Sequence, residues 1–232
     1  MKRIMVLLAE DHVVVREGLR TLLEAEGDIQ VVGEAGSGRE AVQLARQLRP
    51  DVIVMDIAMP RLNGLEATRQ IRKEFPGVRI LILSAHSDEG YLEQVASLGA
   101  AGYLLKQTSA HVLTQAVRTV HEGKAYFSPS LDQRMHESLG PVPDPGKPEH
   151  RKGAPLTSRE VEVLQLIAEG RANKQVAVEL GISIKTVEKH RQRLMDRLNI
   201  HDTAGLTRYA VAAGIIESSF QATVDPETGG PE

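Results

Sequence analysis

The sequence predicts a doubly wound α/β domain with a five-stranded parallel sheet, followed by a smaller domain made only of helices. Short apolar runs alternate with helical patterns in the first half of the chain, whereas the second half contains helical patterns alone. Between the halves, five of the eleven prolines fall at positions 141–155. Because proline fixes φ and removes a backbone donor, this density excludes a helix or a central strand and indicates an extended linker.

Five apolar runs in the first half are the predicted strands. They cover residues 4–9, 29–32, 52–55, 80–83 and 102–105. Continuous runs of valine, isoleucine and leucine are typical of strands that are buried on both faces, as in a parallel sheet.

Helical patterns follow these strands in turn. Apolar side chains recur there at spacings of three and four residues, which indicates amphipathic helices. The predicted helices lie within residues 15–23, 41–48, 65–75, 88–98 and 110–122. Five such β-α units with short connections favour a doubly wound sheet, in which ligands bind beyond the carboxyl ends of the strands.

The second domain is predicted to contain four helices. They lie at residues 157–169, 173–180, 184–198 and 203–213. Thr157 and Glu160 have the spacing of a capping box, and Ser183 is a suitable N-cap for the third helix. The second and third helices are joined by a tight turn, which indicates a helix-turn-helix.

These patterns set the predicted domain boundaries. They give a sheet domain at 1–125, a linker at 126–154 that is proline-rich in its second half, a helical domain at 155–216 and a disordered tail at 217–232. The tail is weakly apolar and rich in proline, glycine and polar residues, a composition that cannot bury a core.

Composition excludes several classes of protein. Hydrophobic residues make up 41% and charged residues 25% of the chain, which is ordinary for a globular protein. The net charge of −3 means that any nucleic-acid site must be local, and the absence of cysteine excludes disulfides and thiolate zinc sites. The apolar run near the N-terminus, residues 4–9, is too short for a membrane span or a signal peptide. We therefore expect a soluble, cytoplasmic protein with no membrane partner.

Polar side chains follow four of the five predicted strands. Glu10 and Asp11 follow the first strand, Asp56 the third, Ser84 the fourth and Lys106 the fifth. A strand-end acid often only caps the next helix, but three carboxylates at one sheet edge would repel one another unless a cation lay among them. Oxygen ligands suit Mg²⁺, and a nearby lysine and hydroxyl suit the oxygens of a phosphoryl group. The pattern predicts a magnesium-dependent phosphoryl site.

The first domain resembles a bacterial response-regulator receiver over residues 3–122. Five segments carry the resemblance: Ala9-Glu10-Asp11-His12, Met55-Asp56-Ile57-Ala58-Met59-Pro60, Asn63-Gly64-Leu65, Ser84-Ala85 and Gly102-Tyr103-Leu104-Leu105-Lys106. The resemblance implies a flavodoxin-like fold. It also implies that Asp56 accepts the phosphoryl group and that Glu10, Asp11 and Asp56 hold Mg²⁺.

Further roles follow from the same resemblance. Lys106 would pair with the phosphoryl oxygens, Ser84 would hydrogen-bond the acyl phosphate, and Tyr103 would reorient when Ser84 moves inward. Ala58 and His86 lie where receivers tune the lifetime of the phosphate. A sensor histidine kinase would donate the phosphoryl group, and the receiver would catalyse only its own phosphorylation and dephosphorylation, so the protein is not otherwise an enzyme.

The third helix of the second domain has two unlike faces. Val187, Leu194 and Leu198 cluster on one side, as a helical period requires. Polar and basic side chains lie largely opposite: Lys185, Lys189, Gln192 and Arg193. A solvated surface helix would look similar, but residues 185–197 hold five basic and two acidic side chains in a chain that is acidic overall. This local positive charge favours DNA binding.

The second domain resembles a LuxR-type helix-turn-helix domain. Three segments carry the resemblance: Leu156-Thr157-Ser158-Arg159-Glu160, Asn173-Lys174-Gln175-Val176-Ala177 and Thr186-Val187-Glu188-Lys189-His190. By position, Glu188, Lys189 and Gln192 would read bases. The backbone contacts would come from Lys185, Thr186 and His190. Ala172 departs from the family, since a small hydroxyl residue is usual before Asn173.

A receiver joined to this DNA-binding domain is the arrangement of NarL/FixJ-type response regulators. The implied function is transcription regulation, with double-stranded DNA as partner and a homodimer when Asp56 is phosphorylated. One alternative is a magnesium-dependent phosphohydrolase with Asp56 as nucleophile. Such an enzyme would need a second carboxylate close by in the sequence, and Ala58 supplies none. The other alternative is a regulator that acts only by protein contact, which binding to random duplex DNA would exclude.

Overall fold

The structure is a computed structural model that describes residues 3–85, 94–127 and 156–216. Two compact units, Met1–Lys152 and Gly153–Glu232, make up the chain and are described separately. The proline-rich part of the predicted linker, the predicted tail and His86 lie outside the described residues, as does the first part of the helix predicted at 88–98. Residues 94–97 of that helix are helical.

The first unit is built on a parallel sheet of six strands. These are β1 (Ile4–Ala9), β2 (Ile29–Ala35), β3 (Val52–Asp56), β4 (Arg79–Ser84), β5 (Gly102–Leu105) and β6 (Tyr126–Phe127). They lie in the order β2-β1-β3-β4-β5-β6, and all neighbours are parallel. The predicted parallel α/β fold is confirmed. Strands β2 and β3 lie on opposite sides of β1, so the strand order reverses between β1 and β3. In sheets of this kind, the ligand-binding crevice lies at the carboxyl ends of the two strands where the order reverses.

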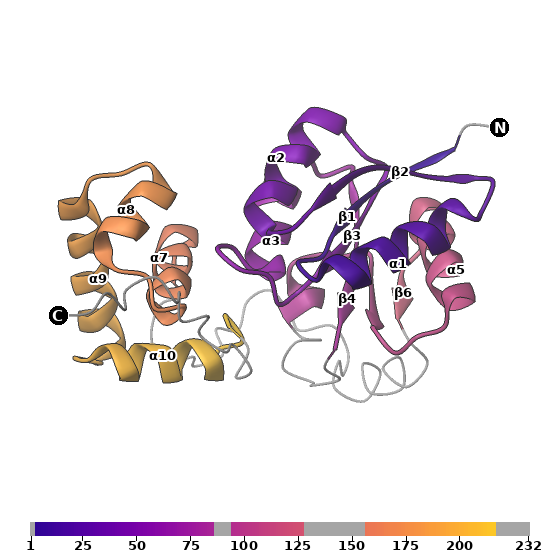
Figure 1. Cartoon of the computed structure of the whole chain (residues 1–232). Coiled ribbons are helices and arrows are strands. Elements are labelled where there is room, and N and C mark those ends of the chain that lie inside the picture. The colour runs from indigo at the N-terminus through magenta and orange to yellow at the C-terminus, as the bar shows by residue number, and fades with distance from the viewer. Residues whose placement is uncertain (1–2, 86–93, 128–155, 217–232) are drawn as a thin grey trace, which may run out of the picture. The chain divides into compact units, whose positions relative to one another are not determined.

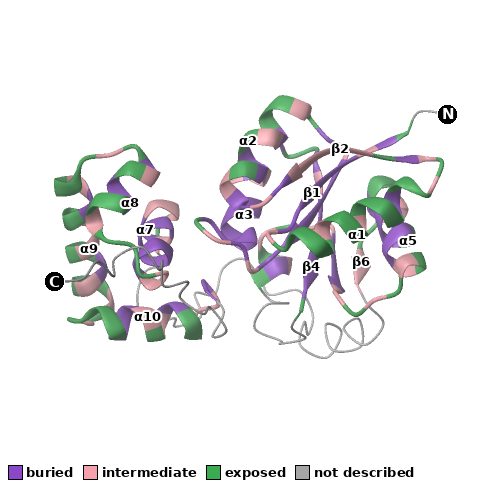
Figure 2. Cartoon of the chain, in the orientation of Figure 1, coloured by how far each residue is buried: buried purple, intermediate pink, exposed green. Residues whose placement is uncertain are grey.

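Helices cover both faces of this sheet (Figure 1). The helices α2 (Gly38–Leu48) and α3 (Gly64–Glu74) pack on one face, and α1 (Val13–Glu24) and α5 (Ala110–His121) pack on the other. Along β1, Leu7 and Ala9 face the first pair of helices, while Val6 and Leu8 face the second. Both sets are buried, and Figure 2 shows the central strands buried accordingly. Because both faces of the strands are buried, the strands appear in the sequence as continuous apolar runs.

The sixth strand is a difference from the predicted five-stranded sheet. Strand β6 has only two residues, too few for any periodic pattern to reveal it. It approaches β5 so closely that a Cβ on Gly102 would lie 2.4 Å from the carbonyl oxygen of Tyr126. The backbone N–H of Tyr126 donates to the carbonyl of Ala101 at 3.0 Å. A glycine at position 102 therefore permits the pairing.

The second unit consists of helices in its described part, 156–216. They are α7 (Ser158–Ala168), α8 (Asn173–Leu180), α9 (Ile184–Leu198) and α10 (Thr203–Ala212), close to the predicted bounds. The predicted capping box is present: the N–H of Glu160 donates to Thr157 Oγ1 at 3.3 Å, and the N–H of Thr157 donates to Glu160 Oε2 at 2.9 Å. Gly181 ends α8 in the left-handed conformation, with φ of 62°. One apolar cluster forms the core of this unit.

No helix within the described ranges is long and apolar enough to cross a membrane.

We predict that Gly64→Ala strongly destabilises the first unit. A Cβ at this position, the first residue of α3, would lie 1.9 Å from the carbonyl oxygen of Asp56. Backbone must move to relieve that contact, so we expect the free energy of unfolding in urea to fall by about 1–3 kcal/mol or more. Gly77→Ala is the matched control, because a Cβ on Gly77 meets no atom within 4 Å. Equal stabilities of the two variants would contradict this close approach.

Candidate functional site

Three carboxylates meet at the crevice between β1 and β3. Glu10 and Asp11 follow the last residue of β1, and Asp56 is the last residue of β3. Pairing of Ala9 with Met55 brings the two strand ends side by side. Glu10 is 1% exposed and Asp56 2% exposed, while Asp11 is partly exposed. The predicted cluster of acidic residues is therefore present, and two of its members are buried.

Lys106 bridges two of these carboxylates. Its Nζ lies 2.8 Å from Glu10 Oε2 and 2.9 Å from Asp56 Oδ2. The backbone N–H of Lys106 donates to the carbonyl of Ser84 at 2.7 Å, which fixes the start of the loop after β5. When all three carboxylates are ionised, the ammonium of Lys106 cancels one of their three negative charges, so these four groups carry a net charge of about −2.

The crowding of charge alters how the carboxyl groups titrate. Burial, reinforced by the charge of Glu10, raises the pKa of Asp56 to about 6, although Lys106 acts in the opposite direction. Burial likewise raises the pKa of Asp11. For Lys106, burial favours loss of the proton, but the charges of Asp56 and Glu10 outweigh it and raise the pKa of the ammonium. The surroundings therefore stabilise the negative charges of Asp56 and Asp11 poorly.

Ser84 and Tyr103 lie on the strands beyond Asp56. Ser84 is the last residue of β4 and is 2% exposed. Tyr103, on β5, has no exposed surface and packs in the core on the side of α2 and α3. In register, Tyr103 pairs with Ile82 of β4 and with Phe127 of β6.

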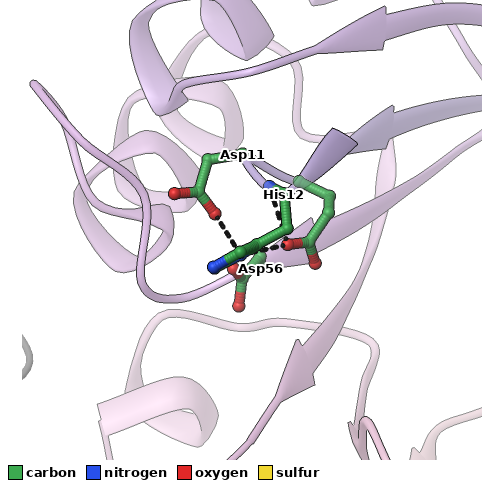
Figure 3. A group of neighbouring side chains, drawn as sticks. Asp11, His12 and Asp56 are labelled. Carbon is green, nitrogen blue, oxygen red and sulfur yellow. Dashed lines mark hydrogen bonds and ion pairs between the residues drawn. The ribbon is translucent and has the colours of Figure 1, made fainter. Parts of the chain in front are cut away.

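Sequence reasoning assigned no role to His12, which joins the carboxylates. Its Nδ1 lies 3.0 Å from Glu10 Oε1 and 2.9 Å from Asp11 Oδ1 (Figure 3). The hydrogen bond to Glu10 and the charge of Asp11 raise the pKa of its imidazole. Its position directly after Glu10-Asp11 was the available signal. One ligand atom from each of four residues lies within 4.8 Å of the others, so this group could hold a metal ion: Glu10, Asp11, His12 and Asp56.

The helix α9 presents a polar face in the second unit. Val187 and Leu194 are buried in the core. Five of the predicted DNA-contact residues are exposed: Lys185, Glu188, Lys189, Gln192 and Arg193. The other two, Thr186 and His190, are partly buried. Spacings of three and four residues bring Lys185, Glu188, Lys189 and Gln192 onto one face of the helix.

Two further arginines of α9 point to other parts of the unit. Arg197 Nη1 lies 2.7 Å from Glu160 Oε2, the carboxylate of the capping box on α7. Arg191 donates to Thr203 Oγ1 at the start of α10. Arg191 and Arg197, which were not among the predicted DNA contacts, therefore make contacts within the unit.

Some predicted contact residues already have partners. Thr186 Oγ1 lies 2.8 Å from Ser183 Oγ at the start of α9, and Gln192 donates to Asp196 at 2.8 Å. The Nδ1 of His190 is buried without a hydrogen bond in the described residues. Ala172 cannot supply a side-chain cap to α8, but its N–H donates to Gln175 Oε1 at 2.9 Å.

Comparison with known proteins gives consistent matches to both units. The family model described as response regulator receiver domain matches residues 6–118, and that described as bacterial regulatory proteins, luxR family, matches residues 154–210. The transcriptional regulatory protein MctR of Rhizobium johnstonii is 40% identical over 92% of this chain and 96% of its own length. LiaR of Bacillus subtilis is 39% identical over 89% and 96%. A solved structure of two RcsB dimers bound to two parallel DNAs has a TM-score of 0.55 and 27% identity, and covers 91% of this chain and 99% of that one.

We predict that Asp56 destabilises the metal-free protein at neutral pH. Its folded pKa of about 6 lies above the value of about 3.9 for an exposed aspartate. Between these values the folded protein holds a proton that the unfolded chain has released, so the free energy of unfolding falls as pH rises from about 4 to about 6.

The corresponding measurement is urea unfolding of Asp56→Asn and wild type in the presence of a chelator. At pH 8 we expect the variant to be more stable by about 1–3 kcal/mol, and the difference to vanish near pH 4. A difference that does not change with pH would contradict the buried charge at Asp56.

Proposed function

Since the chain belongs to the response regulators that join a receiver domain to a LuxR-family DNA-binding domain, we propose that phosphorylation of Asp56 controls its binding to DNA. The chain is a two-component response regulator, as its motifs predicted. The observation that carries the proposal is the bridge from Lys106 to Asp56 and Glu10 at the carboxyl edge of the sheet. A buried carboxylate with a lysine on one of its oxygens is suited to accept and hold a phosphoryl group.

The chemistry is a direct phosphoryl transfer. A carboxylate oxygen of Asp56 attacks the phosphorus of a phosphohistidine on the sensor kinase, the P–O bond forms, and the P–N bond breaks. The released imidazole takes up a proton. Lys106 exchanges its contact with Asp56 for one with a phosphoryl oxygen, and the hydroxyl of Ser84 donates to another. The receiver catalyses its own modification and turns over no metabolite.

The residues present fit a divalent cation, and Mg²⁺ is the one we propose. Glu10, Asp11 and Asp56 supply the hard oxygen ligands that Mg²⁺ prefers. After Lys106 is counted, the three carboxylates carry two excess negative charges, which one divalent cation cancels. When bound, Mg²⁺ neutralises charge that develops on the transferring phosphoryl group.

Phosphorylation of Asp56 could be transmitted through Ser84 and Tyr103 to β6, the edge strand of the sheet. If Ser84 moves towards the phosphoryl group, it vacates space next to β5, where Tyr103 lies in the core. Tyr103 pairs in register with Phe127 of β6, and β6 occupies the first two residues of the segment predicted as linker, 126–154, so the linker begins after Phe127 rather than at residue 126. Reorientation of Tyr103 would therefore change the packing around Phe127, where the linker starts.

DNA binding is proposed to use α9 as the recognition helix. Glu188, Lys189 and Gln192 share an exposed face and are the candidates for reading bases in the major groove. The backbone contacts are assigned to Lys185, Thr186 and His190, and Arg193 is a further DNA-binding residue. A related protein has been solved as dimers on DNA. We propose that phosphorylation likewise favours a homodimer here, matched to two half-sites, and that the protein acts in the cytoplasm.

We predict that a small phosphodonor with Mg²⁺ adds one acid-labile phosphoryl group to the chain. Asp56→Asn should abolish the addition, because the nucleophilic carboxylate is gone, and Asp11→Asn should abolish it by weakening metal binding. Asp51→Asn is the matched control, since Asp51 directly precedes β3 and lies at the opposite end of that strand from Asp56. Intact-mass measurement reads out the product. Undiminished labelling of Asp56→Asn would refute the assignment.

We predict that Lys189→Ala weakens specific DNA binding by about 1–3 kcal/mol and relaxes sequence preference. Arg197→Ala is the matched control on the same helix, because Arg197 pairs with Glu160 and should affect the stability of the domain instead. Titrations with specific and random duplexes separate the outcomes. An equal loss on all sequences would make Lys189 a phosphate contact, and no loss on any sequence would exclude it from the interface.

A further inference from the structure

His12 brings a nitrogen donor into the carboxylate cluster. Figure 3 shows His12 next to Asp11 and Asp56. The Nδ1 atom lies 3.0 Å from Glu10 Oε1 and 2.9 Å from Asp11 Oδ1. These contacts place Nδ1 beside two oxygens of the proposed cation site.

The spacing of the four groups suits one shared ion. Their ligand atoms all lie within 4.8 Å of one another. Two atoms that are each about 2.1 Å from one metal ion can be at most about 4.2 Å apart. The widest spacing of the four ligand atoms therefore exceeds this limit by at most about 0.6 Å, which small rotations of the side chains can remove.

The imidazole is free to make such a shift. The side chain of His12 is 68% exposed. His12 is the N-cap of α1 but makes no side-chain capping bond. Lys106 contacts Glu10 Oε2, whereas His12 contacts Oε1, so the lysine and the imidazole use different oxygens of this buried carboxylate. Lys106 can keep its contacts while His12 binds a metal ion.

We propose that His12, after its Nδ1 releases its proton to solvent, is a nitrogen ligand of the divalent ion in this site and shifts the preference of the site from Mg²⁺ towards Mn²⁺ and later first-row metals. The inference rests on the carboxylate site of the proposed function and adds the residue that sets its metal preference. Carboxylate oxygens alone suit Mg²⁺, which coordinates imidazole poorly, whereas imidazole nitrogen suits transition metals. A mixed oxygen and nitrogen set therefore discriminates between ions that an all-oxygen set binds similarly.

The test compares full-length wild type with His12→Asn at fixed pH. Asparagine remains a good N-cap for α1 and can still donate to Glu10, so the fold of the crevice is retained. His121→Asn is the matched control, because His121 ends α5 and is not among the four residues of the cluster. Electron paramagnetic resonance counts free Mn²⁺ during titration, Mg²⁺ is measured by competition, and pulsed measurements detect nitrogen bound to Mn²⁺.

For His12→Asn we expect Mn²⁺ affinity to fall about tenfold, the lower end of losses seen when even outer groups of metal sites are changed. Mg²⁺ affinity should change much less. Nitrogen coupling to bound Mn²⁺ should be present in wild type and in His121→Asn, and absent in His12→Asn.

Two other outcomes would overturn the inference, and they are distinguishable. If Asp11→Asn and Asp56→Asn lose Mn²⁺ but His12→Asn keeps the wild-type preference, the carboxylate site stands and the role of His12 fails. If the two aspartate variants bind Mn²⁺ as wild type does, the proposed carboxylate site fails and the inference fails with it.

Discussion

Three carboxylates, those of Glu10, Asp11 and Asp56, repel one another in the crevice between β1 and β3, and the ammonium of Lys106 opposes this repulsion through its contacts with Glu10 and Asp56. The strand order creates this crowding, since it brings the ends of β1 and β3 together. Because Glu10 and Asp56 are buried, water screens their charges poorly, and a proton, a metal ion or a lysine must compensate them. Each of these partners is exchangeable, and this exchange is the basis on which we propose that the site responds to a phosphoryl group.

The backbone around the crevice is packed tightly enough to keep these groups in place. The first residue of α3, Gly64, lies against the carbonyl of Asp56, and Asn63 Oδ1 caps α3 by accepting the N–H of Glu66 at 2.8 Å. Gly38 at the start of α2 packs against the carbonyl of Leu62 in the same way. Two glycines therefore bring two helix starts close to the site, where larger residues would push them away.

The sequence predicted most of the fold because its signals are local and strong. Buried runs such as residues 52–55 and the capping box at Thr157 identify their elements directly. Strand β6 was missed since two residues carry no period. His12 and the inward contact of Arg197 with Glu160 were missed for another reason: each depends on which way a long or rotatable side chain turns, and tertiary packing decides that. The cluster of Glu10, Asp11, Asp56 and Lys106 was predictable because strand ends in a parallel sheet share an edge.

If the charge balance at Asp56 governs the DNA-binding domain, then phosphorylation must change how tightly the whole chain binds DNA. The direct measurement is the dissociation constant of the full-length protein for a duplex that the phosphorylated protein selects from genomic fragments. It is made before and after treatment with a small phosphodonor and Mg²⁺, with sedimentation of both forms. We expect binding to tighten about tenfold or more, together with a shift to dimers, as two linked half-sites allow. Equal affinity of the two forms would contradict control of DNA binding by Asp56.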